Sequence, residues 1–314
     1  MRIIFRNILV LALSVSFVLS GCARKVSWEE LNDKAVKLYQ EAQYQEAALT
    51  AEEALELAGD EFGSDHPNVA RALDNLAVIY KAQGRYIEAI PLYGRALEIR
   101  KDKLGPDHPE VADAMNNLAT LYYYQGRYAE AEPIFKETLA MREKNLGPDN
   151  PDVTAAMNNM ATFYYSQGRY DEAEELYKRA MEIDEKSFGP DHPVIATSLN
   201  NLAQIYMDQA RYAEAEPLLK RALDIFEKDL GKEHPNVGTT LNNMATLYYY
   251  QERYSEAELL FKRTLKIFEK IMGPDHPDVA GVLDNMAKLY DKLGRNAEAQ
   301  KLRLRAEEIR SKIQ

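Results

Sequence analysis

Five histidines are the residues whose type could bind a metal ion, and all five occupy one position of a repeating turn. They are His66, His108, His192, His234 and His276. Packed helices lie roughly 8–10 Å apart, whereas two ligands on one zinc ion must lie within roughly 4 Å of each other. Asn150 fills the same position in one further repeat, so a polar turn residue suffices there. The spacing therefore predicts structural turn histidines and no metal site.

Catalytic chemistry has no recognisable motif in this chain. There is no Gly-x-x-x-x-Gly-Lys phosphate loop and no Gly-x-Ser-x-Gly nucleophile elbow. The 50 Asp and Glu residues are expected mostly on solvated helix surfaces, and nothing singles out two of them for acid–base work. The formal net charge of -11 opposes nucleic acid as a partner. We interpret this acidity as a source of solubility rather than as a sign of a basic partner, and we expect a non-enzymatic protein without a cofactor.

The elements that would position any site come from an internal repeat of 42 residues. The repeat is marked by glycines at one step: Gly63, Gly105, Gly147, Gly189, Gly231 and Gly273. Residues 28–314 therefore form one array. Its repeats span about 28–63, 66–105, 108–147, 150–189, 192–231, 234–273 and 276–314.

Each repeat is predicted to form two helices. In the third, apolar residues recur at the spacing of one helical stripe, at Val111, Met115, Leu118 and Tyr122. Pro109 suits the first turn of that helix, and Gly126 suits its end. Either Asp107 or His108 could be the N-cap. Neither helix can bury its apolar stripe alone, so neighbouring pairs must stack.

The two ends of the array differ from its interior. Ser27 and Glu30 have the spacing of a capping box at the start of the first helix. In the last helix Arg303 and Glu307 replace Phe261 and Leu265 of the preceding repeat. These polar residues predict a terminal face that meets water.

The pattern Leu118-Ala119, Tyr122, Gly126, Tyr128 and Ala131 resembles the tetratricopeptide repeat. The 42-residue period, with Asn116-Asn117-Leu118-Ala119 and Gly105-Pro106-Asp107-His108-Pro109, is similar to the kinesin-light-chain type. The resemblance implies an all-α, right-handed α-solenoid of about seven helix pairs, whose first helices line a concave groove that binds peptides. Three local departures are Ala210 and Glu252 in place of the helix-ending glycine, and Asn296 in place of the tyrosine.

The N-terminus has the layout of a secretory signal. Arg2 and Arg6 precede an apolar run of 12 residues, residues 8–19, whereas a membrane span needs about 20. Leu19-Ser20-Gly21-Cys22 resembles the bacterial lipobox and contains the only cysteine. The resemblance implies a lipoprotein signal peptide at residues 1–21, a lipidated Cys22 and a tether at residues 22–27. Ala23 after the cysteine favours anchoring in the outer membrane, facing the periplasm.

A neutral stripe on the first helices is the predicted contact surface. Asn116, Thr120, Tyr123 and Tyr124 share one face of the third repeat's first helix, whereas its second helix is crowded with charges. A stripe of amide, hydroxyl and phenol groups indicates a binding surface. The predicted groove comprises Asn116, Asn117, Thr120, Tyr123, Tyr124, Asn158, Asn159, Thr162, Tyr165, Asn200, Asn201, Asn242, Asn243, Thr246 and Tyr249.

The ladder of Asn75, Asn117, Asn159, Asn201, Asn243 and Asn285 allows two interpretations. An amide once per repeat could hold the backbone of an extended peptide, because three residues of such a peptide span one helix spacing. Alternatively, each amide could bond to the neighbouring repeat and never meet a ligand. The series containing Asn116 and Asn158 points more clearly to the groove.

The sequence therefore predicts a lipid-anchored scaffold that binds an extended segment of a protein partner. The alternative function is a cell-envelope module that binds peptidoglycan glycan, since Tyr and Asn also suit sugars.

Overall fold

The computed structural model describes residues 26–312, which form fourteen α-helices in seven consecutive pairs. The first helices of the pairs are α1 (Trp28–Gln40), α3 (Pro67–Ala82), α5 (Pro109–Tyr124), α7 (Pro151–Ser166), α9 (Pro193–Asp208), α11 (Pro235–Tyr250) and α13 (Pro277–Lys292). The second helices are α2 (Tyr44–Phe62), α4 (Tyr86–Leu104), α6 (Tyr128–Leu146), α8 (Tyr170–Phe188), α10 (Tyr212–Leu230), α12 (Tyr254–Met272) and α14 (Asn296–Ser311). This arrangement confirms the predicted all-α solenoid.

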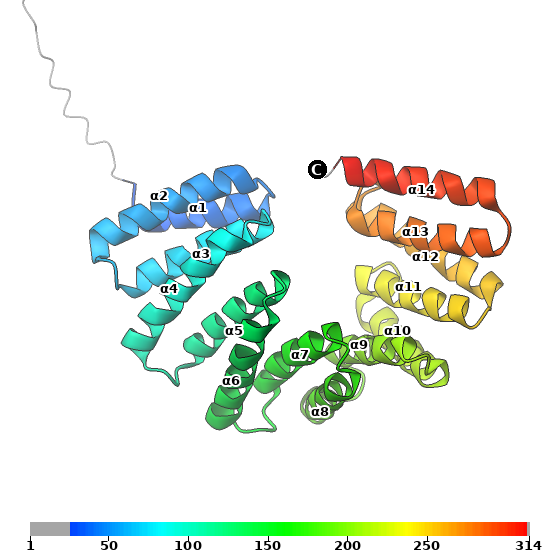
Figure 1. Cartoon of the computed structure of the whole chain (residues 1–314), viewed down its shortest axis with the longest axis horizontal. Coiled ribbons are helices and arrows are strands. Elements are labelled where there is room, and N and C mark those ends of the chain that lie inside the picture. Colours follow the sequence, from blue (N-terminus) through cyan, green and yellow to red (C-terminus); the bar gives the residue numbers. More distant parts are fainter. Residues whose placement is uncertain (1–25, 313–314) are drawn as a thin grey trace, which may run out of the picture.

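The pairs follow one another along an open arc (Figure 1). Each first helix packs on the second helix of its own pair, and from α3 onward also on the second helix of the preceding pair. Some successive first helices are also in contact, for example α9 and α11. The first helices accordingly lie on the inner side of the arc and the second helices on the outer side. We call each helix pair a unit and number the units from one to seven.

The start of each first helix from α3 onward is set by a side-chain cap and a proline. His108 is the N-cap of α5, and its Nδ1 accepts a hydrogen bond from the Glu110 N–H at 3.3 Å. Asn150 caps α7 in the same way through its side-chain oxygen, at 2.8 Å from the Asp152 nitrogen. The choice between Asp107 and His108 is thereby settled, and all five histidines cap helices, which is a structural role.

The turn inside each unit requires one residue in the left-handed region. Gly126 has a φ of 72°, and the replacements Ala210 and Glu252 keep the same conformation at 57° and 61°. The departures from glycine therefore do not change the turn. They place side chains in a conformation that costs L-residues roughly 1–2 kcal/mol.

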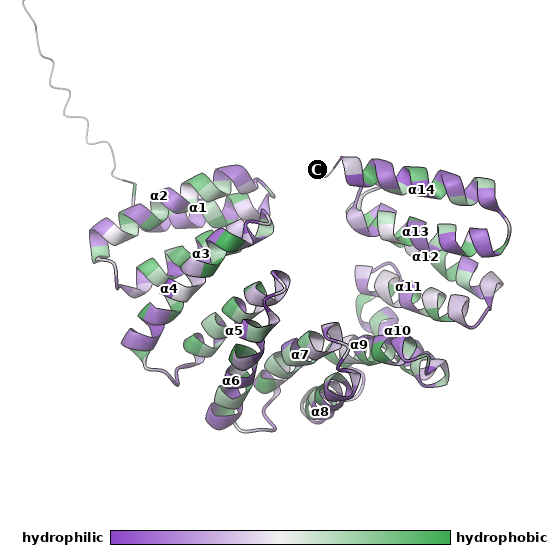
Figure 2. Cartoon of the chain, in the orientation of Figure 1, coloured by the Kyte–Doolittle hydropathy of each residue, from purple (hydrophilic) through white to green (hydrophobic). Residues whose placement is uncertain are grey.

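The core runs along the contact between the two helices of each unit and between neighbouring units. Ala119 and Ala131 are fully buried and let the helices approach closely, while Phe135 and Phe261 fill the wider spaces. Figure 2 shows apolar and polar residues alternating along the helices, as stacked amphipathic helices require.

Both ends of the array match the sequence prediction. Ser27 and Glu30 form the capping box of α1, with the Ser27 hydroxyl accepting from the Glu30 N–H at 3.2 Å. At the other end, Arg303 and Glu307 of α14 are exposed. The expected signal peptide, Cys22 and most of the tether lie outside the described residues. Between residues 26 and 312, no helix is long and apolar enough to cross a bilayer.

Candidate functional site

The asparagines of the inner face bond mainly to one another, from one unit to the next. The Asn159 side-chain amide donates to the side-chain oxygen of Asn116 at 2.8 Å. The same bond joins three further pairs, namely Asn75 to Asn32, Asn243 to Asn200 and Asn285 to Asn242. These four donors make the bond to the neighbouring repeat that the structural interpretation expects, and a role of the ladder in ligand binding stays a prediction. Asn117 and Asn201 make no side-chain hydrogen bond to any described residue.

Asn200 must be removed from the predicted groove, because its side chain is buried. Only 9% of Asn200 is exposed. Its amide donates to the Ala196 carbonyl at 3.1 Å and to the Thr240 hydroxyl at 2.9 Å, and its oxygen accepts from Asn243. Thr240 stands where the other units from two to seven have Ala, Ser or Val, and its hydroxyl accepts a hydrogen bond from the buried amide.

The threonines of the stripe use their hydroxyl protons inside their own helices. The Thr120 hydroxyl donates to the Asn116 carbonyl at 2.8 Å, and Thr162 and Thr246 repeat the bond one turn back along α7 and α11. A hydroxyl that donates internally keeps only its lone pairs for a ligand. Each amide that donates in the ladder has a second N–H, and Asn117 and Asn201 keep both, so the inner face offers free donors as well as free acceptors.

The first helices of the central units contain no basic residue. The helices α5, α7, α9 and α11 contain no Lys, Arg or His, and their only ionisable carboxylates are Glu110, Asp113, Asp152 and Asp208. Asp208 accepts hydrogen bonds from two neutral groups, the Tyr165 hydroxyl and the Gln204 amide. Burial and this bond to Asp208 raise the pKa of Tyr165. Glu110 and Asp113 pair with Arg100 and Arg142 of second helices, which leaves Asp152 and Asp208 without a basic partner among the described residues.

The predicted tyrosines divide into exposed and half-buried groups. Tyr124 is 56% exposed and Tyr250 is 51% exposed. Tyr123 and Tyr249 are half-buried and pack against them, with ring centroids 5.3 Å and 5.6 Å apart. These residues form two equivalent aromatic clusters, one in unit three and one in unit six.

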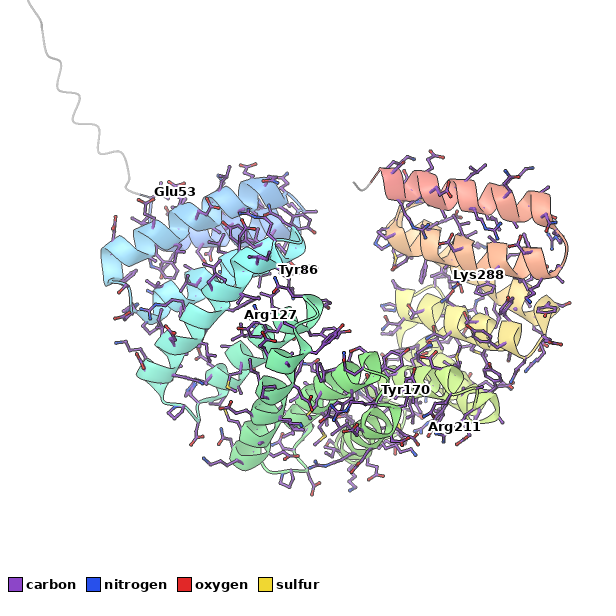
Figure 3. All side chains as sticks on the ribbon, in the orientation of Figure 1. Glu53, Tyr86, Arg127, Tyr170, Arg211 and Lys288 are labelled. Carbon is purple, nitrogen blue, oxygen red and sulfur yellow. The ribbon has the colours of Figure 1, made fainter. Side chains whose placement is uncertain are left out.

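A second set of tyrosines completes both clusters and was missed in the sequence. Tyr86 stacks on Tyr124 of the next unit, with centroids 6.0 Å apart and planes 14° apart. Tyr212 stacks on Tyr250 in the same way, at 5.8 Å and 8°. We call these the two tyrosine pairs. Tyr86 lies on the side facing the hollow of the arc (Figure 3). The available signal was a tyrosine at the start of six successive second helices.

An arginine beside the intra-unit turn packs on a tyrosine ring in units two to seven, and in units four to seven it also binds a glutamate of the preceding unit. The Arg253 guanidinium lies 3.7 Å from the centroid of the Tyr248 ring, donates to Glu256 of its own unit, and reaches back to Glu216 of the preceding unit at 3.1 Å. We call this arrangement the arginine clamp. It recurs, with or without the reach to the preceding unit, at Arg85, Arg127, Arg169, Arg211 and Arg295.

Electrostatics in the clamp favour ionised carboxylates. Hydrogen bonds from Lys220 and Arg253 lower the pKa of Glu216 to about 2, and those from Lys262 and Arg295 do the same for Glu258. The outer surface is therefore densely charged but internally paired, in contrast to the inner face.

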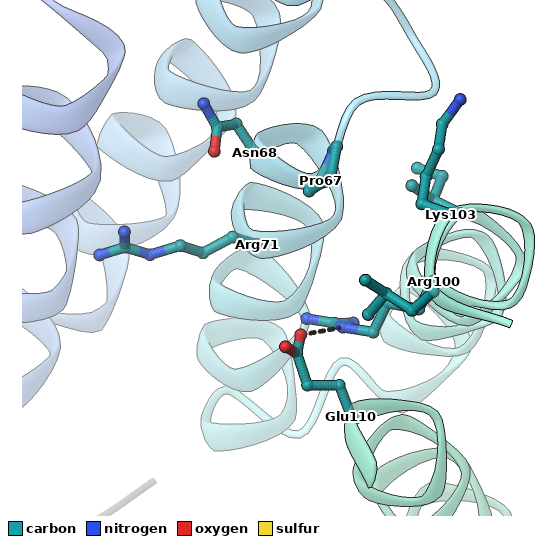
Figure 4. Close-up of a pocket in the computed structure, with 8 residues that line it drawn as sticks. Pro67, Asn68, Arg71, Arg100, Lys103 and Glu110 are labelled. Carbon is teal, nitrogen blue, oxygen red and sulfur yellow. Dashed lines mark ion pairs between the residues drawn. The ribbon is translucent and has the colours of Figure 1, made fainter. Parts of the chain in front are cut away.

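Cavities between neighbouring units open near the caps of the first helices. Figure 4 shows one of about 260 Å³, where Arg100 pairs with Glu110 of the next unit at 3.5 Å. Arg100 also binds Asp74 within its own unit. An equivalent cavity between units six and seven is lined by Phe268, Asn242 and Val282, among others.

The junction between units four and five holds polar groups without partners. Counting back two repeats from Phe268 and Val282 gives Asp184 and Ser198 at the corresponding places. Asp184 is fully buried, and neither of its carboxylate oxygens has a partner among the described residues. The nearby Thr154 hydroxyl donates instead to the Pro151 carbonyl. Burial raises the pKa of Asp184.

Comparison with known proteins identifies the family. The tetratricopeptide repeat model matches residues 31–102, 74–144, 152–228, 194–270 and 260–312. The chain belongs to the tetratricopeptide repeat family, as the repeat pattern predicted. No curated protein gives a significant match.

Solved structures of the same architecture include proteins of the kinesin-light-chain type. BtubC (BKLC) from P. vanneervenii is 25% identical with a TM-score of 0.61, over 73% of this chain and 92% of that one. A putative kinesin light chain with nearly identical repeats from Podosopora anserina is 27% identical with a TM-score of 0.57, over 64% and 95%. The quorum sensor NprR from B. thuringiensis, at 16% identity and a TM-score of 0.72 over 90% and 76%, shares the fold alone.

Proposed function

We propose that this protein is an interaction scaffold that holds an extended segment of a partner protein along its inner face. Tetratricopeptide repeat proteins generally mediate protein–protein interaction, and their scaffold is typically non-catalytic. The observation that supports this site is the contrast between the two surfaces. The outer helices satisfy their charges in the arginine clamps, whereas the inner face exposes aromatic rings beside a stripe of amide and hydroxyl groups over units three to six.

The spacing of the units suits an extended polypeptide. Neighbouring helices lie roughly 8–10 Å apart, and an extended chain rises about 3.3 Å per residue. About three residues of a partner therefore span one unit. Its backbone meets the stripe of amide and hydroxyl groups, and its side chains meet the tyrosines.

Cross-linking from defined positions tests this placement. A photoreactive amino acid replaces Tyr123, Tyr165 or Tyr249 on the inner side, and Lys262 of α12 on the outer side serves as the control. In the native cell we expect all three inner probes to label one partner, at sites that follow one another along its sequence. Labelling from Lys262 alone, or labels scattered over unrelated proteins, would exclude the inner face as the binding site.

The scaffold is further proposed to be exported and lipid-anchored through Cys22, in the outer membrane and facing the periplasm. Support comes from the signal-like N-terminus and its lipobox resemblance. Two or three acyl chains anchor firmly, because each buried methylene contributes about 0.8 kcal/mol. Mass spectrometry of the N-terminal fragment of the mature protein should show the added acyl mass on Cys22. An unmodified cysteine would overturn the anchor.

A further inference from the structure

We infer that the partner segment is basic, and that two of its cationic side chains, about nine residues apart, bind the two tyrosine pairs. This inference rests on the proposed function and specifies the chemistry of the partner. Net charge alone predicts only solubility. The argument comes instead from where rings, acceptors and acids lie on the inner face.

The two tyrosine pairs present equivalent open ring surfaces. In each pair one ring comes from the start of a second helix and the other from the end of the next unit's first helix, stacked within 14° of parallel. One face of Tyr124 and of Tyr250 is covered by this stacking. More than half of each of these two side chains nevertheless remains exposed. Open tyrosine faces attract cations through the negative potential above the ring.

The protein already uses this contact internally. Six arginines lie over tyrosine rings with their guanidinium carbons 3.7–4.4 Å from the ring centroids. Each of these internal arginines also binds a carboxylate. The exposed pairs have the ring without the guanidinium, so an arginine from a partner would complete the same arrangement.

An acid near the two tyrosine pairs that has no basic partner among the described residues favours a cationic guest over a neutral or acidic one. The hydroxyl protons of Thr120 and Thr246 are donated within the protein, so these two groups offer a guest only their lone pairs. Arginine and lysine side chains are donors only. Asp208 occupies, in unit five, the position that Tyr124 and Tyr250 hold in units three and six, and it bonds only neutral groups. An acid therefore lies between the two pairs in the register of the repeat.

The distance between the pairs sets the spacing of the two cations. Tyr124 and Tyr250 are 126 residues apart in the sequence, which is three repeats of 42. Three unit spacings along the inner face amount to roughly 30 Å, which an extended segment spans in about nine residues. Two cations on one chain also bind more tightly than either alone, since the second contact is intramolecular.

Fluorescent peptides of defined sequence test the inference with a truncated protein that starts at Ala23. The probe is a neutral 15-residue peptide with two arginines nine positions apart, and the matched probe has citrulline, an uncharged isostere, at both places. By fluorescence anisotropy we expect the arginine peptide to bind at least about tenfold more tightly. Moving the arginines to four positions apart should lose most of that advantage, and high salt should weaken it.

Tyr124→Ser with Tyr250→Ser removes one ring of each pair at exposed positions. This double variant should lose the preference for arginine while keeping its thermal midpoint, whereas Tyr44→Ser in unit one should keep both. Equal binding of the arginine and citrulline peptides would overturn the basic partner and leave the scaffold function intact. Binding of chitohexaose that the double variant abolishes, without a preference for arginine, would assign the pairs to glycan instead. If neither peptide binds, the inference fails, while in-cell cross-linking still decides the scaffold function independently.

Discussion

Junctions on either side of unit four fill the same position of the repeat with different chemistry. The position lies late in each second helix, at Ala58, Arg100, Arg142, Asp184, Phe226, Phe268 and Arg310. In units two and three, Arg100 and Arg142 form ion pairs with acids on their own first helices. In units five and six, Phe226 and Phe268 are buried instead. The repeat thus determines where a side chain points, while an ion pair or an aromatic ring can fill the space equally well.

At this position unit four has neither an ion pair nor an aromatic ring. Asp184 has no basic group to pair with, and it stands where the following units have phenylalanine. An unpartnered buried carboxylate destabilises a fold because its hydration is lost without replacement. The junction between units four and five is therefore expected to be the weakest in the array.

Removing one member of an ion-paired junction should have the largest effect. Arg100→Leu leaves Asp74, whose side chain is 20% exposed, without its cation. Burial already raises the pKa of Asp74. We expect a loss of about 2 kcal/mol in the free energy of unfolding, measured by urea denaturation. Arg100→Leu combined with Asp74→Leu should recover most of it. If the double variant is no more stable than the single one, ion-paired and apolar junctions are not interchangeable.

Crowding the aromatic junction should cost slightly less. A Cβ atom on Gly238 would lie 2.4 Å from the Phe268 ring, so Gly238→Ala must displace that ring. The expected loss is about 1–2 kcal/mol. Gly281→Ala in α13 is the matched control, because its Cβ would meet no atom within 4 Å. This control should be neutral or stabilising, since alanine favours helices. Equal losses in both variants would mean that Phe268 does not require the glycine.

Replacing the buried Asp184 of unit four by an apolar residue should stabilise the protein. Asp184→Leu removes the unpartnered carboxylate and is expected to add about 1 kcal/mol at pH 7. The raised pKa means that the cost of Asp184 grows as pH rises from its ordinary value through the folded-state value. The advantage of leucine should therefore shrink in acid. Asp224→Leu, at an exposed site of α10, is the control, and an equal gain there would indicate a general effect of added hydrophobicity.

The smallest effect at neutral pH is expected at the arginine clamps that join units five, six and seven. Glu216 and Glu258 have pKa values of about 2, below the ordinary 4.5, so they stabilise the fold above pH 4.5. This contribution is lost as pH falls from 4.5 toward 2. Glu216→Gln with Glu258→Gln should flatten the acid side of the stability profile, followed by circular dichroism. An unchanged acid limb would show that the clamps add nothing to stability.

The fold could be predicted because its signals are local and recur seven times. Pro109 and Gly126 mark the ends of one helix, and their equivalents repeat at a constant step. The polar ends of the array could be predicted for the same reason, because Arg303 breaks a pattern that Phe261 sets.

The site was harder to predict because its contacts cross from one unit to another. Asn116 and Asn200 both open the sequence Asn-Asn-Leu-Ala, yet only Asn200 is bonded to a threonine of the following unit, Thr240. Arg253 meets an acid 37 residues earlier, which no helical spacing suggests. The burial of an amide and the partner of an arginine depend on packing between units, so the sequence of one unit does not determine them.

The direction of the arginine clamp bears on how such an array can change length. A single 42-residue segment supplies the arginine that reaches backward and the glutamate that receives the next arginine, as Arg211 and Glu216 of unit five do. A duplicated segment would therefore contain both the arginine and the glutamate that the clamp requires. Gene duplication or an engineered insertion of whole repeats can lengthen this protein without any new contact having to evolve.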